Sequence, residues 1–351
     1  MIELLLVSPQ TEKSKGGIAV WTDMFIRNCN QHEISCDLLN IATIGKRAEM
    51  GNAKRNLFDE FIRTKSIFSN LKRMLRGKTY NVAHVNTSCG NFGLIRDYMT
   101  VLKIKKKQPL CKVIVHFHCD IETWCHSSVS RFFLSRMLKI SDVAMVLNER
   151  NYRYLYDGYG ICSEIVSNFI DTDMLRKEPK NISPEIKDAL FVGYVRPDKG
   201  IRELYDLAQR APDITFHLAG EIHDEVQSWD KPHNVILCGK KDHSDVLDEM
   251  DKADVFVFLS HSEGFSIALL EAMSRGLPCI ATDVGANKEM LESKGGVIVP
   301  PQDVDAASAA LESINDPRLR SEMSEWNIEK VRSCYIAQSV LSKITEVYKK
   351  N

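Results

Sequence analysis

Twelve short apolar runs alternate with helical stretches along the chain, and they fall into two series of six. Such runs, rich in β-branched and aromatic residues and separated by helices, are typical of buried strands in a parallel sheet with helices on both faces. The first series comprises residues 2–8, 35–41, 82–87, 112–118, 143–148 and 164–168, and the second comprises 189–195, 214–219, 235–238, 255–260, 279–283 and 297–299. The sequence therefore predicts an α/β protein with two doubly wound, Rossmann-like domains.

The domain boundaries follow from the segment between the two series. It contains Pro179, Pro184 and several charges, and its length suits a linker. We expect a first domain at 1–170, a linker at 171–187, a second domain at 188–330 and a closing helix at 331–351. An apolar stripe that could pack on either domain runs along this last helical stretch, through Trp326, Val331, Tyr335, Val340, Ile344 and Val347.

A candidate anion site follows the strand predicted at 255–260. Ser266 is suited to cap a helix that begins at Ile267, and Gly276 with Pro278 is a stop signal. Free N–H groups and the positive end of the helix dipole converge at such a helix start. This geometry favours a phosphate, with Glu263 in the preceding loop and Glu271 inside the helix.

The spacing of the two glutamates limits what they can do together. Eight helical steps of about 1.5 Å separate the carboxylates by at most about 12 Å. A glycosidase pair needs roughly 5 to 9.5 Å, so a hydrolytic dyad is disfavoured, although bending of the loop would shorten the distance. The layout suits a ligand with a hydroxyl-bearing ring on each side of a diphosphate, which is the plan of a nucleotide-sugar.

The composite pattern resembles the E-x7-E signature of family-4 glycosyltransferases, which are retaining enzymes with the GT-B fold. It consists of Glu263-Gly264-Phe265-Ser266, seven residues between the glutamates, Glu271-Ala272 and Gly276-x-Pro278. The resemblance implies two domains that face a central cleft, the first for the acceptor and the second for the nucleotide-sugar, and a last helix that crosses back to the first domain. It assigns sugar hydroxyls to Glu263, ribose to Glu271, and the diphosphate to the amides around Phe265 and Ser266.

Two further stretches match the family's phosphate-binding positions. Gly16 and Gly17 stand between the first strand and its helix, where glycines let backbone N–H groups approach a phosphate; Lys15 adds charge beside them. Lys199 matches a cation that stabilises the departing diphosphate, whereas Tyr194 occupies the place of the usual arginine. Arg196, two residues later, is the candidate substitute.

Three other residues are assigned to the site by resemblance. Cys238 and Gly239 end a strand at the edge of the sheet where the family binds the nucleotide base of the donor, largely through backbone atoms. His118 matches a histidine near the reacting sugar, where it would bind the sugar or polarise the acceptor.

A zinc site near the fourth strand is the alternative for this histidine. His116 and His118 point to the same side, with Cys119, Cys125 and His126 nearby. Their spacing fits no structural zinc pattern, so we expect neither a metal nor any other cofactor.

Charge is unevenly distributed between the halves of the chain. Residues 1–172 carry 24 Lys and Arg against 16 Asp and Glu, whereas the remainder carries 22 against 31. Residues 54–78 form a basic amphipathic stretch that either lies on an anionic membrane or packs on the sheet. Nucleic acid is not expected as a partner, because no recognition module accompanies the basic residues.

The expected location is the cytoplasm, at or near the inner face of the membrane. The chain starts directly with a strand-like run, and no apolar stretch approaches a membrane span. Ten scattered cysteines, most of them within apolar runs, read as reduced core residues.

The predicted function is that of a retaining glycosyltransferase. It would move a hexose or N-acetylhexosamine from a nucleoside-diphosphate donor, UDP in preference, to a glycan or a polyprenyl- or lipid-linked acceptor in surface polysaccharide assembly. Two alternatives remain: a nucleotide-sugar epimerase of related fold, and a non-catalytic partner of another transferase.

Overall fold

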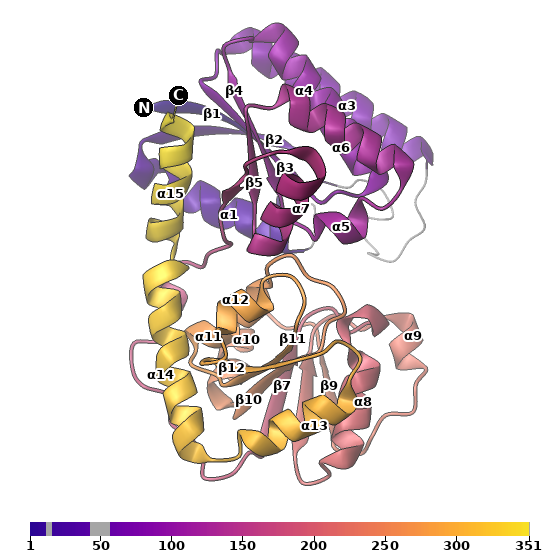
Figure 1. Cartoon of the computed structure of the whole chain (residues 1–351), viewed down its shortest axis with the longest axis vertical. Coiled ribbons are helices and arrows are strands. Elements are labelled where there is room, and N and C mark those ends of the chain that lie inside the picture. Colours follow the sequence, from indigo (N-terminus) through magenta and orange to yellow (C-terminus); the bar gives the residue numbers. More distant parts are fainter. Residues whose placement is uncertain (12–15, 43–56, 351) are drawn as a thin grey trace. The chain divides into compact units, whose positions relative to one another are not determined.

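The protein is divided into two compact units, each built on one parallel sheet. The computed structural model describes residues 1–11, 16–42 and 57–350 (Figure 1). Unit 1 comprises residues 1–168 and 337–351, and unit 2 comprises 169–336, so the chain passes between them twice. Both sheets have six strands, which confirms the predicted α/β class with two doubly wound domains.

The sheet of unit 1 has the strand order β2-β1-β3-β4-β5-β6, and all its strand pairs are parallel. The last five residues of β1 and every residue of β3 are buried, as expected for strands covered on both faces. The strands are β1 (Ile2–Ser8), β2 (Ile34–Asn40), β3 (Val82–Thr87), β4 (Lys112–Phe117), β5 (Val143–Val146) and β6 (Glu164–Ile165).

Helices cover both faces of this sheet. On one face α3, α4 and α6 lie side by side, while α1 and α15 contact each other on the opposite face (Figure 1). The helices of the N-terminal part are α1 (Gly17–Cys29), η1 (Asn30–His32), α3 (Leu57–Gly77), α4 (Asn91–Lys107), α5 (Ile121–Trp124), α6 (Ser128–Ile140) and α7 (Glu149–Tyr159).

The last helix, α15 (Ala337–Lys349), belongs to unit 1, as the resemblance implies. Its buried side chains include Val340, Leu341, Ile344 and Val347, and burial of each such side chain contributes about 1.5 to 3 kcal/mol. Near its end, the Tyr348 hydroxyl lies 2.5 Å from Nδ1 of His84 on β3. The chain terminus is thus fixed to the first sheet by both apolar and polar contacts.

The closing helical stretch is not continuous, and in this respect our expectation was wrong. Helix α14 (Pro317–Cys334) ends before Tyr335, and α15 begins after Ile336. The Ile170 amide donates to the Tyr335 carbonyl at 2.9 Å, and Ile170 forms a β-bridge with Ile336. These backbone contacts replace helical hydrogen bonds and divide the apolar stripe between the two units.

The sheet of unit 2 has the order β12-β11-β10-β7-β8-β9, again with parallel pairs. Helix α8 packs beside α13, and α11 packs beside α14. The strands are β7 (Asp188–Val192), β8 (Thr215–Ala219), β9 (Val235–Gly239), β10 (Val255–Phe258), β11 (Cys279–Thr282) and β12 (Gly296–Val299); the other helices are η2 (Thr172–Met174), η3 (Pro197–Lys199), α8 (Ile201–Arg210), α9 (Asp224–Gln227), α10 (His243–Lys252), α11 (Ile267–Ser274), α12 (Asn287–Leu291) and α13 (Val304–Ser313).

Residues 171–187, the predicted linker, pack on unit 2. The buried Lys180 ammonium donates to the carbonyl oxygens of Met250 and Asp251 at 3.2 and 2.7 Å. The buried Arg320 donates to the carbonyl oxygens of Ser183 and Pro184. This segment therefore runs along the second unit and is held there by charge-assisted hydrogen bonds.

Two further sequence expectations concern membrane spans and cysteines. Among the helices formed by described residues, none combines the length and apolarity needed to cross a bilayer. All ten cysteines have free thiols, and six of them are buried.

Candidate functional site

The centre of the sheet in unit 2 is a point where the direction of winding reverses. Strands β7 and β10 are hydrogen-bonded neighbours, with β8 and β9 on one side and β11 and β12 on the other. Loops that leave the carboxyl ends of two such strands diverge, and ligands of doubly wound sheets bind in the crevice between them. The loops after β7 and β10 carry Lys199 and Glu263, respectively.

Lys199 and Glu263 form an ion pair across these two loops. The distance between Lys199 Nζ and Glu263 Oε1 is 2.5 Å, and the two side chains are only 20% and 13% exposed. The loops are also joined by the His261 amide, which donates to the Asp198 carbonyl at 3.0 Å. The structure therefore brings together two predicted site residues that are 64 positions apart in the sequence.

Gly200 permits this close approach of the loops. Its φ is +74°, and a Cβ atom at this position would lie 2.1 Å from the Leu259 carbonyl oxygen. Any other residue would force the chain after β7 away from the end of β10. The glycine after Lys199 is thus required by the backbone, independently of any ligand.

The start of α11 lies in the same loop region, as the sequence predicts. The Ser266 hydroxyl accepts a hydrogen bond from the Leu269 amide at 3.2 Å and so caps the helix. The Gly264 carbonyl accepts from the Ala286 amide at 3.0 Å, and the Phe265 ring packs edge-on against Tyr335 at 5.4 Å. These contacts fix the backbone before the helix, whose first amides have no intrahelical acceptor and can donate to an anion.

Glu271 has a different partner from Glu263. It is 6% exposed, and its Oε1 lies 3.0 Å from Nε2 of His243, the first residue of α10. The two signature glutamates therefore have separate partners. Sequence reasoning missed His243, because no motif connects a residue at the start of α10 with a glutamate 28 positions later in α11.

Arg196 does not join the Lys199–Glu263 pair. Its guanidinium binds both carboxylate oxygens of Asp198 at 2.6 Å and lies 5.5 Å from the centre of the Tyr194 ring. The side chain is 40% exposed. That Arg196 takes the place of the arginine absent at position 194 stays a prediction.

Cys238 and Gly239 lie at the end of β9, at the edge of the sheet. Gly239 has a φ of +68° and its carbonyl accepts from the Gly220 amide at 2.9 Å, so this turn is ordered by its backbone. Partial burial raises the pKa of the Cys238 thiol, which keeps it protonated. Neither side chain is charged, as expected for a stretch whose predicted contribution comes from backbone atoms.

The predicted glycine loop belongs to unit 1. Gly16 is the residue before α1, with a φ of +114°, and its carbonyl accepts from the Ala19 amide at 3.1 Å. Gly17 is the first residue of the helix, so both glycines lie at a helix N-terminus after β1. Ser14 and Lys15 lie outside the described residues. Participation of the two glycines in donor binding stays a prediction.

His118, directly after β4, is oriented by a chain of hydrogen bonds. Its Nε2 lies 3.1 Å from Asn86 Oδ1, while Asn86 Nδ2 donates to the Ser8 hydroxyl at 2.9 Å. The amide oxygen of Asn86 therefore faces the histidine, which places the imidazole proton on Nε2 and leaves Nδ1 as an acceptor. Burial and the neighbouring His116 and His84 lower the pKa of His118, so the ring is neutral.

The other histidine of this motif has a structural position. His116 is fully buried, its ring centre lies 4.0 Å from that of His118, and burial lowers its pKa to about 3. Within the described part of the chain, no group of three or more His, Cys, Asp or Glu residues is arranged to hold a metal ion. The zinc alternative thus gains no support here.

Comparisons with known proteins find similarity to glycosyltransferases. A family model described as glycosyl transferases group 1 matches residues 175–330, which is nearly all of unit 2. Glycogen synthase of Mycobacterium tuberculosis is 28% identical over 175 residues, covering 46% of this chain and 42% of the relative. The chain thus matches less than half the length of that relative. The capsular polysaccharide biosynthesis glycosyltransferase CapM of Staphylococcus aureus is 23% identical over 316 residues, covering 81% and 82% of the two chains.

The fold comparison extends over the whole chain. The structure of HepE from Anabaena in complex with UDP and glucose superimposes with a TM-score of 0.74 at 16% identity, covering 100% of both chains. At this level of identity the likeness shows the fold, which is GT-B. Together with the family model, it supports a glycosyltransferase of this architecture.

Proposed function

We propose that the protein is a retaining glycosyltransferase that moves a hexose or N-acetylhexosamine from a nucleoside-diphosphate donor, with UDP preferred. The observation that carries the proposal is the Lys199–Glu263 pair beside the start of α11, at the reversal point of the second sheet. A cation, a carboxylate and converging amides within one crevice suit a diphosphate joined to a hydroxyl-rich ring.

Donor binding would rearrange the ion pair. A diphosphate carries more negative charge than a carboxylate, so it would compete with Glu263 for Lys199 and release Glu263 to accept hydrogen bonds from sugar hydroxyls. The positive charge of Lys199 would then offset the charge that develops as the diphosphate leaves. Arg196 would contribute after leaving Asp198, which is an exposed and therefore weak partner.

Glu271 would bind the ribose, with His243 holding its carboxylate in place. The contact of 3.0 Å fixes one oxygen of Glu271 and leaves the other for a ribose hydroxyl. Gly16 and Gly17 would contribute backbone amides to diphosphate binding, and His118 would bind the sugar or polarise the acceptor by accepting a hydrogen bond through Nδ1. The sequence motifs assign no carboxylate as a covalent nucleophile, so we favour same-face attack assisted by the leaving phosphate.

The names of two relatives support the proposed acceptor class. CapM acts in capsular polysaccharide biosynthesis by its name, and a diacylglycerol glucosyltransferase of Acholeplasma laidlawii is 24% identical over 246 residues. A glycan or a lipid-linked glycan in surface polysaccharide assembly is therefore the proposed acceptor. Contact with an anionic membrane through residues 54–78 and location at its inner face are part of the proposal, as is the absence of a metal or other cofactor.

A thermal-shift panel of nucleoside diphosphates and their sugars tests donor binding. A ligand at one hundred times its dissociation constant adds about 2.7 kcal/mol, which for a unit of this size raises Tm by about 5 to 10 °C. We expect selective stabilisation by one base, lost in Glu271→Ala and retained in the control Lys294→Ala. The donor assignment is wrong if no nucleoside diphosphate stabilises the wild type.

A transfer assay tests the chemistry. With an acceptor glycan, Lys199→Ala should lower kcat by about 10² to 10³, because it removes a group that stabilises the leaving diphosphate. NMR of the product should show the donor's anomeric configuration. Conversion of the donor sugar without any acceptor would indicate an epimerase, and neither conversion nor transfer would indicate a non-catalytic partner.

A further inference from the structure

Exposed apolar side chains are concentrated in unit 1. Among the described residues, the second unit exposes only Ile236 of its large hydrophobic side chains. Most of those in unit 1 lie on helices that begin at the carboxyl edge of its sheet, within their first two turns: Phe58, Phe61 and Ile62 on α3, Phe92 on α4, Trp124 on α5, and Val129 and Phe132 on α6. Exposure of Phe58 and Phe61 reaches 67% each. Clustered exposed aromatic residues usually mark an interaction surface.

The amphipathic stretch at 54–78 has apolar residues both on the side of α3 that packs on the sheet and at exposed positions. Residues 54–56 lie outside the described part of the chain. Within α3, Ile67, Leu71 and Leu75 are buried against the sheet, as the packing alternative predicts. Phe58 and Phe61 are exposed and do not belong to that buried cluster, so packing on the sheet accounts for only part of the apolar pattern.

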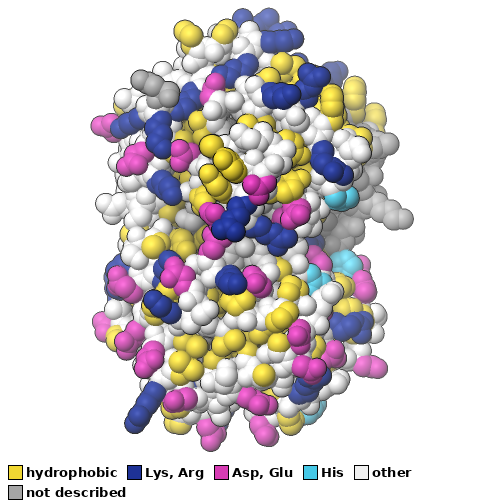
Figure 2. All heavy atoms as spheres, in the orientation of Figure 1, with side chains coloured by type: hydrophobic (Ala, Val, Ile, Leu, Met, Phe, Trp, Pro, Cys, Tyr) yellow, Lys and Arg dark blue, Asp and Glu magenta, His cyan; other side chains and the backbone are white. Residues whose placement is uncertain are grey.

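Beside these apolar residues, the exposed surfaces of α3, α4 and α6 carry many positive charges. Figure 2 shows Lys and Arg side chains over the region that these helices occupy in Figure 1. None of the acidic residues of the three helices is exposed. The exposed cations are Lys65, Lys72, Arg73 and Arg76 on α3, Lys103, Lys106 and Lys107 on α4, and Arg131, Arg136 and Lys139 on α6.

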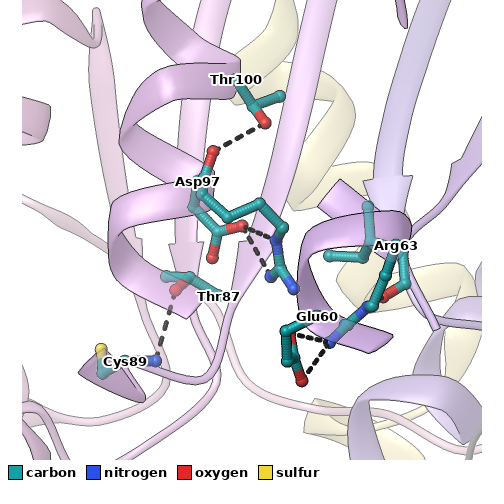
Figure 3. Close-up of polar contacts among 8 residues, drawn as sticks. Glu60, Arg63, Thr87, Cys89, Asp97 and Thr100 are labelled. Carbon is teal, nitrogen blue, oxygen red and sulfur yellow. Dashed lines mark hydrogen bonds and ion pairs between the residues drawn. The ribbon is translucent and has the colours of Figure 1, made fainter. Parts of the chain in front are cut away.

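Ion pairs hold two of the three acidic side chains of α3 and α4 (Figure 3). Glu60 accepts from Arg63 Nη1 at 3.1 and 3.3 Å, and Arg63 Nε also donates to the Ile41 carbonyl at 3.2 Å. Asp97 is fully buried and accepts from Arg96 Nε and Nη2 at 2.9 and 2.7 Å. These contacts keep two carboxylates largely out of solvent, and the Arg63 contact with Ile41 also attaches α3 to the segment after β2.

We propose that the outer face of α3, α4 and α6, here called the docking face, binds an anionic lipid bilayer. The cations would lie against lipid headgroups, and the aromatic side chains at the helix starts would insert at the boundary with the acyl chains. A soluble anionic polymer would satisfy the cations but leave the aromatic rings in water. Of these two occupants, only an anionic bilayer matches both kinds of side chain. This inference rests on the membrane contact of the proposed function and extends it from residues 54–78 to three helices.

Vesicle flotation tests the electrostatic part. The wild type should bind phosphatidylcholine vesicles that contain phosphatidylglycerol, bind pure phosphatidylcholine far less, and be released by salt. Each cation near an anionic surface changes affinity about fivefold, so Lys72→Gln, Lys106→Gln and Lys139→Gln combined should weaken binding by about 100-fold. The control combines Lys177→Gln, Lys252→Gln and Lys294→Gln in unit 2; it makes the same change in net charge and should leave binding unchanged.

The aromatic part needs its own variants. Phe61→Ser with Phe92→Ser should weaken binding to the anionic vesicles by about tenfold or more, whereas Ile236→Ser should not. The inference fails if the wild type does not bind the anionic vesicles, or if the triple lysine variant of the docking face binds them as well as the wild type does. It also fails if soluble polyphosphate binds the wild type and the phenylalanine variant equally while anionic vesicles bind neither. A UDP thermal shift without vesicles separates the two proposals, since vesicle binding without a nucleotide response would refute only the proposed donor and transfer chemistry.

Discussion

Acidification should destabilise unit 1 through the buried histidines of its sheet. His84 and His116 are both fully buried, with ring centres 5.3 Å apart. The rings that face them from α1 and α15 belong to Trp21, Phe25 and Tyr348, none of which supplies a carboxylate. Burial lowers the pKa of His116 to about 3, and burial with repulsion from His116 lowers the pKa of His84 well below its ordinary value.

The size of the effect follows from proton linkage. In the unfolded chain a histidine has a pKa of about 6.5, so below that pH the unfolded state binds more protons and stability falls as the pH decreases. The stabilising contribution is complete above pH 6.5 and is lost toward the folded pKa, which is about 3 for His116. Between pH 7 and pH 5, each histidine that stays neutral in the folded protein lowers the free energy of unfolding by about 2 kcal/mol, and the two together lower it by about 4 kcal/mol.

Urea unfolding at pH 7 and pH 5 measures this difference. The free energy of unfolding should fall by about 4 kcal/mol in the wild type, beyond the change caused by other groups. In His116→Leu the pH-dependent loss should be smaller by about 2 kcal/mol, because one titrating group has been removed. An unchanged pH dependence in this variant would show that His116 titrates alike in the folded and unfolded protein, and its assignment as a neutral ring at pH 5 would then be wrong.

Two further predictions concern unit 2. Gly200→Ala should lower the free energy of unfolding, measured by heat or urea, by more than about 3 kcal/mol, because the new Cβ would lie 2.1 Å from the Leu259 carbonyl oxygen and the residue would keep a positive φ. The control Gly239→Ala has a similar φ of +68° but no atom within 4 Å, so it should cost about 1 kcal/mol. Equal losses in the two variants would contradict the steric argument. His243→Ala should weaken nucleoside-diphosphate binding by about fivefold to tenfold through a less ordered Glu271, measured by calorimetry, and normal affinity would exclude this positioning role.

Local sequence patterns determined the elements of this protein. All twelve strands appear where apolar runs predict them, and β1 and β3 have the predicted bounds. Ser266 caps α11 as its residue type suggests, since a cap depends on only three or four neighbouring residues. The glutamate signature and its flanking glycines likewise lie within one strand–loop–helix segment, which is why the sequence alone could locate the centre of the candidate site.

Only the tertiary structure decided which distant residues meet. Lys199 pairs with Glu263 because β7 and β10 are neighbours in the sheet, and His243 reaches Glu271 because the start of α10 lies against the middle of α11. The strand order, the break between α14 and α15, and the exposure of Phe58 and Phe61 depend on contacts across the fold. Hydrophobic periodicity records whether a residue lies on an apolar face, but it does not record what covers that face.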